Sequence, residues 1–394
     1  MNDAADGTTP VYEDDDVKVI ATKQPAAGCI VTFSSLNVHD QPFGRNYLEK
    51  SGISGVYFIA KWNHWWQPAG CRAAIAAAVQ YMAASQPGPI MTYGSSMGGY
   101  GAALYSGRLD ASTVLMLSPQ YTPDPAKPPH ETRWAKEARE ITFLHDDMAA
   151  EISRTARKIV IYDTHDPDSR HAALFAAIPG TELFGTPFAG HPAGYFLLQT
   201  KLLQELVLGA YGGALDRHQY RDIVRRRRGE SGNYWHRLGI AANRTNHPWG
   251  LDCLLRAVQA RPSDAAILMD QANALLRARK FEEAILGFEK GVLLAPQAPA
   301  PLRGLSVSYR HLGDSRKAVA FGEAALALRP DSTDLRRVLV YALLMENAFG
   351  RAREIIRPAV AKEPDNVDNL RLLAKIDHLL QASEAGVDPS DKTP

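Results

Sequence analysis

A serine between two glycines carries the strongest chemical signal in the chain. Residues 94–98 read Gly-Ser-Ser-Met-Gly and fit the pattern G-x-S-x-G. The apolar run 90–93 before the pattern predicts a short strand, and the small residues after it predict a helix. In that setting the pattern forms a nucleophile elbow, which presents its middle serine on a strained turn. Ser96 is therefore the candidate nucleophile; the alternative is a glycine-rich turn that only packs a helix onto a sheet.

Composition narrows the classes of protein to which this chain can belong. It has 394 residues, of which 45% are hydrophobic and 22% charged, so we expect a soluble protein of two domains. A net charge of +1 argues against nucleic acid as the main partner. We expect neither a signal peptide nor a membrane span. The three cysteines form no C-x-x-C pair, which favours a reducing compartment and hence a cytoplasmic protein.

The first half of the chain alternates between two kinds of segment. We expect residues 1–16 to be a flexible acidic lead-in and residues 17–212 to form one domain. Short apolar segments in this domain predict strands near 17–21, 28–35, 55–60, 90–93, 112–119, 158–163 and 181–184. The segments between them predict helices at 69–85, after the elbow, from about 131 to 157, at 169–178 and at 193–208. This alternation predicts a three-layer, mostly parallel α/β sheet, whose chemistry lies beyond the carboxyl ends of the strands.

A strongly charged segment follows, at residues 213–232. It contains four consecutive arginines, residues 225–228. We interpret the segment as a linker or a first helix, with a solvated face. A patch for nucleic acid or acidic lipid is the alternative, although one short run in a neutral chain would release few counterions.

The second half of the chain repeats with a fixed period. Four prolines recur at one constant interval, and three alanines keep the same interval: Pro262, Pro296, Pro330 and Pro364, with Ala284, Ala318 and Ala352. A period of about 34 residues, a small residue where two helices touch and a proline at the end of each unit resemble tetratricopeptide repeats. That resemblance implies an all-α solenoid over residues 233–382, with a disordered tail at 383–394. Leu268, Leu302 and Leu370 share one position of the repeat, which Arg336 interrupts.

The N-terminal domain resembles the α/β-hydrolase family, in which the order along the chain is serine, acid, histidine. In that family the acid follows a strand by a few residues and precedes a residue such as proline. Asp166, before Pro167, matches that position, while Asp163 and Asp168 remain alternatives. His191 lies between the last predicted strand and the closing helix, where the family has its base.

The resemblance also implies an oxyanion hole of two backbone N–H groups. The first donor would be Met97, at the start of the elbow helix. The second would come from the loop after the strand that ends near Phe33, and therefore from Ser34, Ser35 or Leu36. The family often has His-Gly in that loop, where this chain has two serines.

Further residues at strand ends are candidates for substrate binding. Residues 61–67 read Lys-Trp-Asn-His-Trp-Trp-Gln and follow a predicted strand, so His64, Trp65 and Trp66 should rim the pocket. Such side chains could stack on a sugar or grip a flat acyl group, and the alternative is that they are buried structural residues. Gln120 ends another strand on the same side.

These observations together predict a serine hydrolase that cleaves an ester or acyl bond through an acyl-enzyme. Its substrate could be linked to a glycan, and the repeats would bind a protein or peptide partner or join two copies of the chain. Acyl transfer to a glycan or peptide hydroxyl and a non-catalytic repeat adaptor are the alternatives. No metal cluster, phosphate loop or dinucleotide motif is recognised, so we expect no cofactor.

Overall fold

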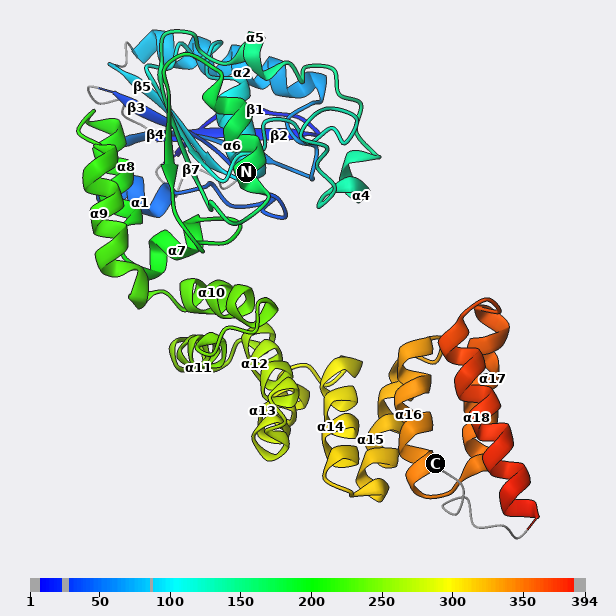
Figure 1. Cartoon of the computed structure of the whole chain (residues 1–394). Coiled ribbons are helices and arrows are strands. Elements are labelled where there is room, and N and C mark those ends of the chain that lie inside the picture. Colours follow the sequence, from blue (N-terminus) through cyan, green and yellow to red (C-terminus); the bar gives the residue numbers. More distant parts are fainter. Residues whose placement is uncertain (1–7, 23–27, 86–87, 386–394) are drawn as a thin grey trace. The chain divides into compact units, whose positions relative to one another are not determined.

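A computed structural model describes residues 8–22, 28–85 and 88–385. The chain forms two compact units, Met1–Arg237 and Leu238–Pro394 (Figure 1). The first contains a mixed, mostly parallel sheet with helices, and the described residues of the second form helical hairpins. The fold class expected from the sequence is confirmed. No helix among the described residues is both long and apolar enough to cross a membrane.

The sheet of the first unit has eight strands in the order β1-β2-β4-β3-β5-β6-β7-β8. The β1–β2 and β2–β4 pairs are antiparallel, and every other neighbouring pair is parallel. The strands are β1 (Thr8–Glu13), β2 (Val17–Thr22), β3 (Cys29–Phe33), β4 (Ser54–Ala60), β5 (Ile90–Ser95), β6 (Thr113–Leu117), β7 (Arg157–Tyr162) and β8 (Thr181–Gly185). All residues of β3 and β4 are buried, as expected of strands covered on both faces.

The expected lead-in is partly a strand, because β1 lies within it and forms the edge of the sheet. The acidic run after β1 makes the turn into β2. The Asp14 carboxylate accepts the N–H groups of Asp16 (2.9 Å) and Val17 (2.7 Å), and the Tyr12 hydroxyl donates to it (2.7 Å). Aspartate closes turns in this way, so the acidic run makes a hairpin. The rest of the expected lead-in, residues 1–7, lies outside the described residues.

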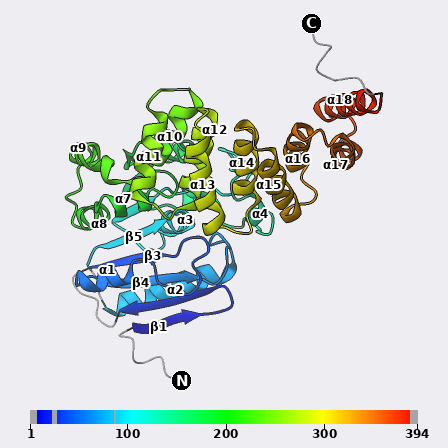
Figure 2. The same cartoon turned by 90° about the horizontal axis from the view of Figure 1, so that it is seen from below.

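Helices cover both faces of this sheet. α2 lies on one side, and α8 and α9 lie on the other (Figures 1 and 2). α3 follows β5 directly and packs on β3, β5 and β6. The helices of this unit are α1 (Arg45–Lys50), α2 (Ala69–Ser85), α3 (Met97–Leu104), α4 (Ala135–Ala138), α5 (Met148–Glu151), α6 (Asp168–Ala176), α7 (Gly194–Gln199), α8 (Leu203–Tyr211) and α9 (Arg217–Arg227), with a 3-10 turn at Arg228–Glu230.

The segment between β6 and β7 is mostly irregular, although the sequence predicted a helix from about residue 131 to 157. Only the short α4 and α5 form within it. Side-chain contacts hold the segment instead. The buried Asp146 carboxylate accepts from Tyr100 (2.8 Å), Thr122 (2.5 Å) and Lys127 (2.9 Å). This segment carries Glu131, Arg133 and Trp134.

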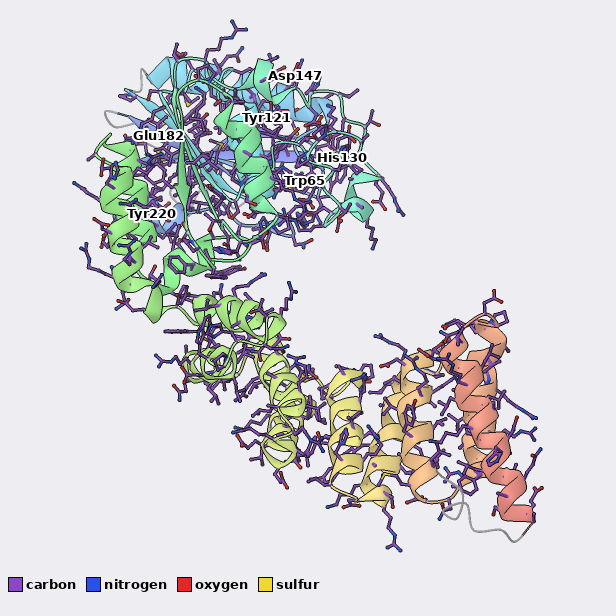
Figure 3. The ribbon with its side chains drawn as sticks, in the orientation of Figure 1. Trp65, Tyr121, His130, Asp147, Glu182 and Tyr220 are labelled. Carbon is purple, nitrogen blue, oxygen red and sulfur yellow. The ribbon has the colours of Figure 1, made fainter. Side chains whose placement is uncertain are left out.

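The charged segment 213–232 is not a free linker, because most of it is the helix α9. Asp216 caps that helix by accepting from the N–H groups of residues 218 and 219. Tyr220 packs on Phe184 of β8, with ring centres 5.3 Å apart, and its hydroxyl hydrogen-bonds Thr186 at 2.6 Å (Figure 3). These buried contacts make α9 part of the first unit.

The second unit repeats its helix boundaries at a constant interval. The residues before α12, α14, α16 and α18 are Asp264, Ala298, Ser332 and Asn366. The helices from the unit boundary onward are α10 (Gly232–Arg244), which spans it, α11 (Gly250–Ala260), α12 (Ala265–Arg277), α13 (Phe281–Leu294), α14 (Pro299–His311), α15 (Ser315–Leu328), α16 (Thr333–Met345), α17 (Phe349–Lys362) and α18 (Val367–Glu384). α18 extends into the expected tail, of which residues 386–394 lie outside the described residues.

The periodic prolines and alanines explain this repeat. α11, α13, α15 and α17 each end two residues before a proline, because the residue before proline is forced out of the helical conformation. Ala284, Ala318 and Ala352 are fully buried. Each lies near the start of the second helix of a hairpin, where a small side chain lets that helix pack closely on its neighbours.

Candidate active site

Ser96 lies on a sharp turn between β5 and α3. Its backbone has φ 53° and ψ −121°, a conformation that is costly for any residue other than glycine. A Cβ atom on Gly94 would overlap the carbonyl group of Gly98, and one on Gly98 would overlap the carbonyl oxygen of Phe33 in β3. The glycines of the motif are therefore needed for close approach between backbones, rather than for clearance around Ser96 itself.

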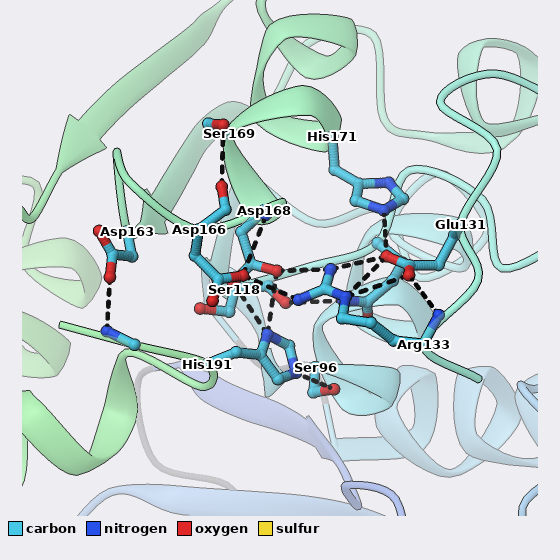
Figure 4. Close-up of polar contacts among 12 residues, drawn as sticks. Ser96, Ser118, Glu131, Arg133, Asp163, Asp166, Asp168, Ser169, His171 and His191 are labelled. Carbon is cyan, nitrogen blue, oxygen red and sulfur yellow. Dashed lines mark hydrogen bonds and ion pairs between the residues drawn. The ribbon is translucent and has the colours of Figure 1, made fainter. Parts of the chain in front are cut away.

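His191 lies in the loop between β8 and α7, and its ring reaches the serine (Figure 4). The distance between Ser96 Oγ and His191 Nε2 is 2.9 Å. The other ring nitrogen, Nδ1, faces a carboxylate, which only accepts hydrogen bonds when ionised. Nδ1 therefore carries the proton, and Nε2 is free to accept from the serine hydroxyl.

The carboxylate that faces His191 belongs to Asp168. Its Oδ2 and Oδ1 lie 2.8 Å and 3.0 Å from His191 Nδ1. The Asp168 side chain is fully buried at the first position of α6. Burial alone would raise the pKa of Asp168, but the hydrogen bond from His191 and the charges of His191 and Arg133 lower it. Asp168 is therefore held as an anion against the imidazole.

Asp166, which the sequence favoured for this contact, does not contact His191. Its Oδ1 accepts from Arg133 Nη1 at 2.8 Å, and its Oδ2 lies 3.8 Å from Arg237 Nη1. The chain turns at Pro167, the N-cap of α6, and the residue after that proline is the one that faces the histidine. Burial, and then the neighbouring Asp168, raise the pKa of Asp166.

Asp163, the other alternative, holds the loop that carries the histidine. Its carboxylate accepts from the backbone N–H groups of His165 (2.8 Å), Phe188 (2.9 Å) and Gly190 (2.7 Å). The side chain is buried, so these three bonds satisfy a carboxylate that water does not reach. Asp163 therefore fixes the backbone on which His191 stands.

Ser118, which the sequence did not single out, also supports the acid. Its hydroxyl hydrogen-bonds Asp168 and thereby lowers the pKa of that carboxyl. Its oxygen also accepts the N–H of Ala193 at 3.0 Å. Ser118 lies just after β6 with a strained backbone of φ 47°. Its position at the end of a predicted strand was its only signal in the sequence.

Of the four expected oxyanion donors, Ser34 is excluded by its own backbone hydrogen bond, and Met97, Ser35 and Leu36 remain. The Ser34 N–H donates to the Phe58 carbonyl at 2.9 Å and is therefore occupied. Ser35 and Leu36 line the same pocket as Ser96. Met97 is the first residue of α3, where a helix leaves its N–H groups without an intrahelical partner.

The residues expected to bind substrate from the segment 61–67 are buried instead. His64, Trp65 and Trp66 have no exposed surface, and none lines the pocket beside Ser96. Trp66 Nε1 donates to the carbonyl oxygen of Met97 at 3.0 Å, so this tryptophan supports the elbow helix. Trp65 lies inside the first unit with its ring 5.5 Å from that of Trp134 (Figure 3).

His64 explains why this segment turns inward. Its Nδ1 accepts the N–H of Trp66 at 2.9 Å, and its Nε2 donates to the Asp16 carbonyl at 3.1 Å. Trp65 and Trp66 both have positive φ, which strand and helix patterns do not reveal. Gln120 is also fully buried, and its Nε2 lies 3.4 Å from the Ser118 carbonyl oxygen.

A pocket of about 360 Å³ opens beside Ser96. Its walls are mainly apolar and come from the loop after β3, from β5 and β6, and from α7: Leu36, Val38, Phe43, Leu117, Tyr195 and Leu198. Trp134 also lines it, with its ring centre 5.1 Å from that of His191. Among the residues that the structure describes, the lining includes no lysine, arginine, aspartate or glutamate.

Asp166, Asp168 and His191 each bring a potential metal-ligand atom within 4.8 Å of the others. The two carboxylates already accept hydrogen bonds from the guanidinium of Arg133, at 2.8 Å and 2.9 Å. Nδ1 of His191 donates to Asp168. With Arg133, these groups therefore satisfy one another's hydrogen bonds without a metal ion.

Comparison with known proteins identifies the second unit. The sequence profile of the tetratricopeptide repeat family matches residues 309–376. The constant interval between helix starts and the pairing of the helices agree with that match. The C-terminal unit is a tetratricopeptide-repeat domain. Within it, Arg336 departs from the leucine of the other repeats and donates to the carbonyl oxygens of Ile355 and Pro330.

Several solved structures are similar to part of this chain. The first tetratricopeptide domain of human RPAP3 is 23% identical over 31% of this chain and 95% of its own, with a TM-score of 0.30. The Sgt2 tetratricopeptide domain from Aspergillus fumigatus is 19% identical over 33% and 88%, with a TM-score of 0.30. MamA is 13% identical over 40% and 86%, with a TM-score of 0.36. No curated protein matches the chain.

Proposed function

We propose that the first unit is a serine hydrolase of the α/β-hydrolase type, in which Ser96, His191 and Asp168 form the catalytic triad. The observation that carries this proposal is the unbroken chain of contacts from Ser96 Oγ to His191 (2.9 Å) and from His191 to Asp168 (2.8 Å). A serine hydroxyl is a weak nucleophile, so it needs an adjacent base and a group that orients that base. This chain supplies both within hydrogen-bond distance.

In the proposed reaction, Ser96 Oγ attacks the acyl carbonyl while His191 Nε2 takes its proton. The Asp168 carboxylate stabilises the imidazolium that forms. The backbone N–H of Met97, with that of Ser35 or Leu36, would stabilise the oxyanion. His191 then protonates the leaving alcohol, and the acyl group stays on Ser96. Water activated by the same histidine releases the acid and restores the serine.

The pocket favours an ester whose acyl group is apolar and carries no charge. Its apolar walls would desolvate a charged acyl group without pairing its charge, which costs several kcal/mol. Trp65 and Trp66, which the sequence suggested could hold a sugar acceptor, are buried. Hydrolysis is therefore our proposal, and acyl transfer to a glycan has no observation of its own to support it.

The test is a panel of p-nitrophenyl esters of graded chain length, applied to the wild type and to Ser96→Ala. Removing the nucleophile should lower kcat by several orders of magnitude, about 10⁶ in well-studied triads. Ser95→Ala is the matched control, because it alters the neighbouring hydroxyl in the same motif, and it should lose less than about tenfold. A Ser96→Ala protein that kept most of its turnover would show that the assignment is wrong.

For the tetratricopeptide-repeat domain we propose a role in protein–protein interaction, through a peptide partner or a second copy of the chain. Stacked helical hairpins of this kind present extended surfaces suited to such binding. Sedimentation of the full chain over a range of concentrations tests the second possibility. A mass that rises toward twice 43.1 kDa would support self-association, and a constant monomer mass would leave the peptide partner.

A further inference from the structure

Arg133 links three carboxylates around the proposed triad (Figure 4). Its Nη2 donates to Asp168 at 2.9 Å and its Nη1 to Asp166 at 2.8 Å. The same guanidinium donates to both oxygens of Glu131, at distances between 2.6 Å and 3.1 Å. One arginine from the irregular segment therefore reaches the residue that holds His191 and two further carboxylates.

The partners of Glu131 fix its charge. His171 Nδ1 accepts the N–H of Tyr121, so its Nε2 carries the proton that is donated to Glu131 at 2.9 Å. The hydrogen bonds from His171 and Arg133 outweigh burial and hold the pKa of Glu131 far below its usual range. Glu131 is thus an anion that orients the guanidinium. Nη1 of Arg133 donates to Asp166, and Nη2 donates to both Glu131 and Asp168.

The two aspartates need a cation between them. Oxygen atoms of Asp166 and Asp168 lie within 4.8 Å of one another, and both side chains are largely buried. Two carboxylates so close cannot both stay ionised easily, and the pair would take up a proton. Arg237 faces Asp166 alone, at 3.8 Å, and the two histidines nearby contact Asp168 and Glu131. Among the described residues, Arg133 is the cation that contacts both aspartates.

The arginine also contacts the residue that packs on the base. Its guanidinium carbon lies 4.4 Å from the ring centre of Trp134, and that ring lies 5.1 Å from His191. Consecutive residues of one segment therefore touch the acid and the base of the triad.

We propose that Arg133 is a positioning residue that keeps Asp168 ionised and aimed at His191 by neutralising the Asp166–Asp168 pair. The proposal rests on the serine hydrolase function proposed above. It predicts that Arg133 controls the ionisation of Asp168 as well as the positions of the triad side chains. Asp166, which does not contact His191, is then the second half of a charge-balanced pair.

The test is the pH profile of kcat/KM for an ester substrate in four proteins: the wild type, Arg133→Gln, Arg133→Lys, and Arg133→Gln combined with Asp166→Asn. Arg133→Gln removes one positive charge, so the acid limb of the profile should move to higher pH by about one to three units. Arg133→Lys restores the charge and should keep the limb near that of the wild type.

The double variant separates a charge effect from a packing effect. Asp166→Asn removes the negative charge that Arg133 had balanced, so it should return the acid limb of Arg133→Gln toward the wild-type position. If Arg133 only held the segment in place, losing a second contact would bring no such return. Arg237→Gln is the matched control, because it removes a cation that does not reach Asp168, and its limb should move less than that of Arg133→Gln.

Three outcomes would overturn the proposal: an unmoved limb in Arg133→Gln, equal moves in the Gln and Lys variants, or no return in the double variant. Circular dichroism shows whether each variant is folded, and titration with a fluorophosphonate counts its reactive sites. Together they allow each rate to be expressed per folded, reactive site. If Arg133→Gln did not fold, the single variant Asp166→Asn would decide the matter, since it should move the limb to lower pH. A wild type that neither turns over nor labels would instead mean that the proposed function is wrong.

Discussion

In the tetratricopeptide-repeat domain one structural role returns once in every repeat, whereas each polar role at the Ser96 site belongs to a single residue. Ala284, Ala318 and Ala352 perform the same task in successive hairpins, so a departure such as Arg336 leaves the period visible. At the site, Asp163, Asp166 and Asp168 are close neighbours in the sequence and do three different things. The period of a repeat can therefore be predicted from the sequence. The different contacts of aspartates that lie close together in the sequence cannot.

The largest expected effect comes from replacing single carboxylates by amides, which tests whether the aspartates have different roles. Asp168→Asn should lower kcat by about 10⁴, because an amide no longer stabilises the imidazolium or fixes its tautomer. Asp166→Asn should cost far less at neutral pH, because Asp166 contacts Arg133 and not the base. Steady-state kinetics on the same ester measures both. Equal losses in the two variants would remove the distinction between these neighbours.

The next largest effect should be a loss of stability at low pH that is greater in the first unit than in the repeat domain. Burial lowers the pKa of His64 to about 4 from its usual value of 6.5. The unfolded chain therefore takes up a proton below pH 6.5 while the folded unit does not, and stability falls until pH reaches about 4. At 1.36 kcal/mol for each pKa unit, the loss is about 3 kcal/mol. In the repeat domain burial also lowers the pKa of His311, but that side chain is exposed, so we expect a smaller loss there.

Urea unfolding between pH 7 and pH 4.5 measures this effect, with a separate probe for each unit because two units need not unfold together. His64→Asn keeps an acceptor for the Trp66 N–H and has no group that titrates in this range. Its first unit should be less stable at pH 7 and should lose less on acidification. The same pH slope in wild type and variant would show that another group is responsible.

The smallest expected effects test close packing in the repeats. A Cβ atom on Gly304 would overlap the ring of the buried Phe288, so Gly304→Ala should destabilise the domain by about 1–3 kcal/mol. Gly350 lies in α17 with nothing within 4 Å of such an atom. Gly350→Ala should therefore stabilise the domain by about 0.5–1 kcal/mol. Urea midpoints measure both, and a shift of the same sign in the two variants would contradict the packing.

The sequence predicted much of the fold because its elements are regular. Seven of the eight strands follow from apolar runs, and the helical hairpins follow from the prolines and alanines. β1 was missed because the acidic turn after it looks like part of a loose terminus, although Asp14 uses its carboxylate to close the hairpin. The sequence left open whether α9 is a linker or a helix, because its few buried side chains, such as Tyr220, stand among many charged residues.

A residue of the candidate site could be predicted only where a motif or a loop contains one suitable side chain. The motif around Ser96 and the loop of His191 are two such places, and the structure brings the two side chains together. Asp168 was not separable from Asp166, because the choice depends on how the turn at Pro167 enters α6. The inward course of residues 64–66 depends on two positive φ angles, and the role of Arg133 depends on contacts with residues far away in the sequence.

The most direct measurement is covalent labelling of the full-length protein with a fluorophosphonate, followed by peptide mapping with mass spectrometry. A phosphonyl group should appear on Ser96, should be absent in Ser96→Ala, and should form far more slowly in Asp168→Asn than in wild type. A folded wild-type protein that takes up no label, or takes it up at another serine, would contradict the proposed role of Ser96. The helical repeats would then be the part of the chain that carries its function.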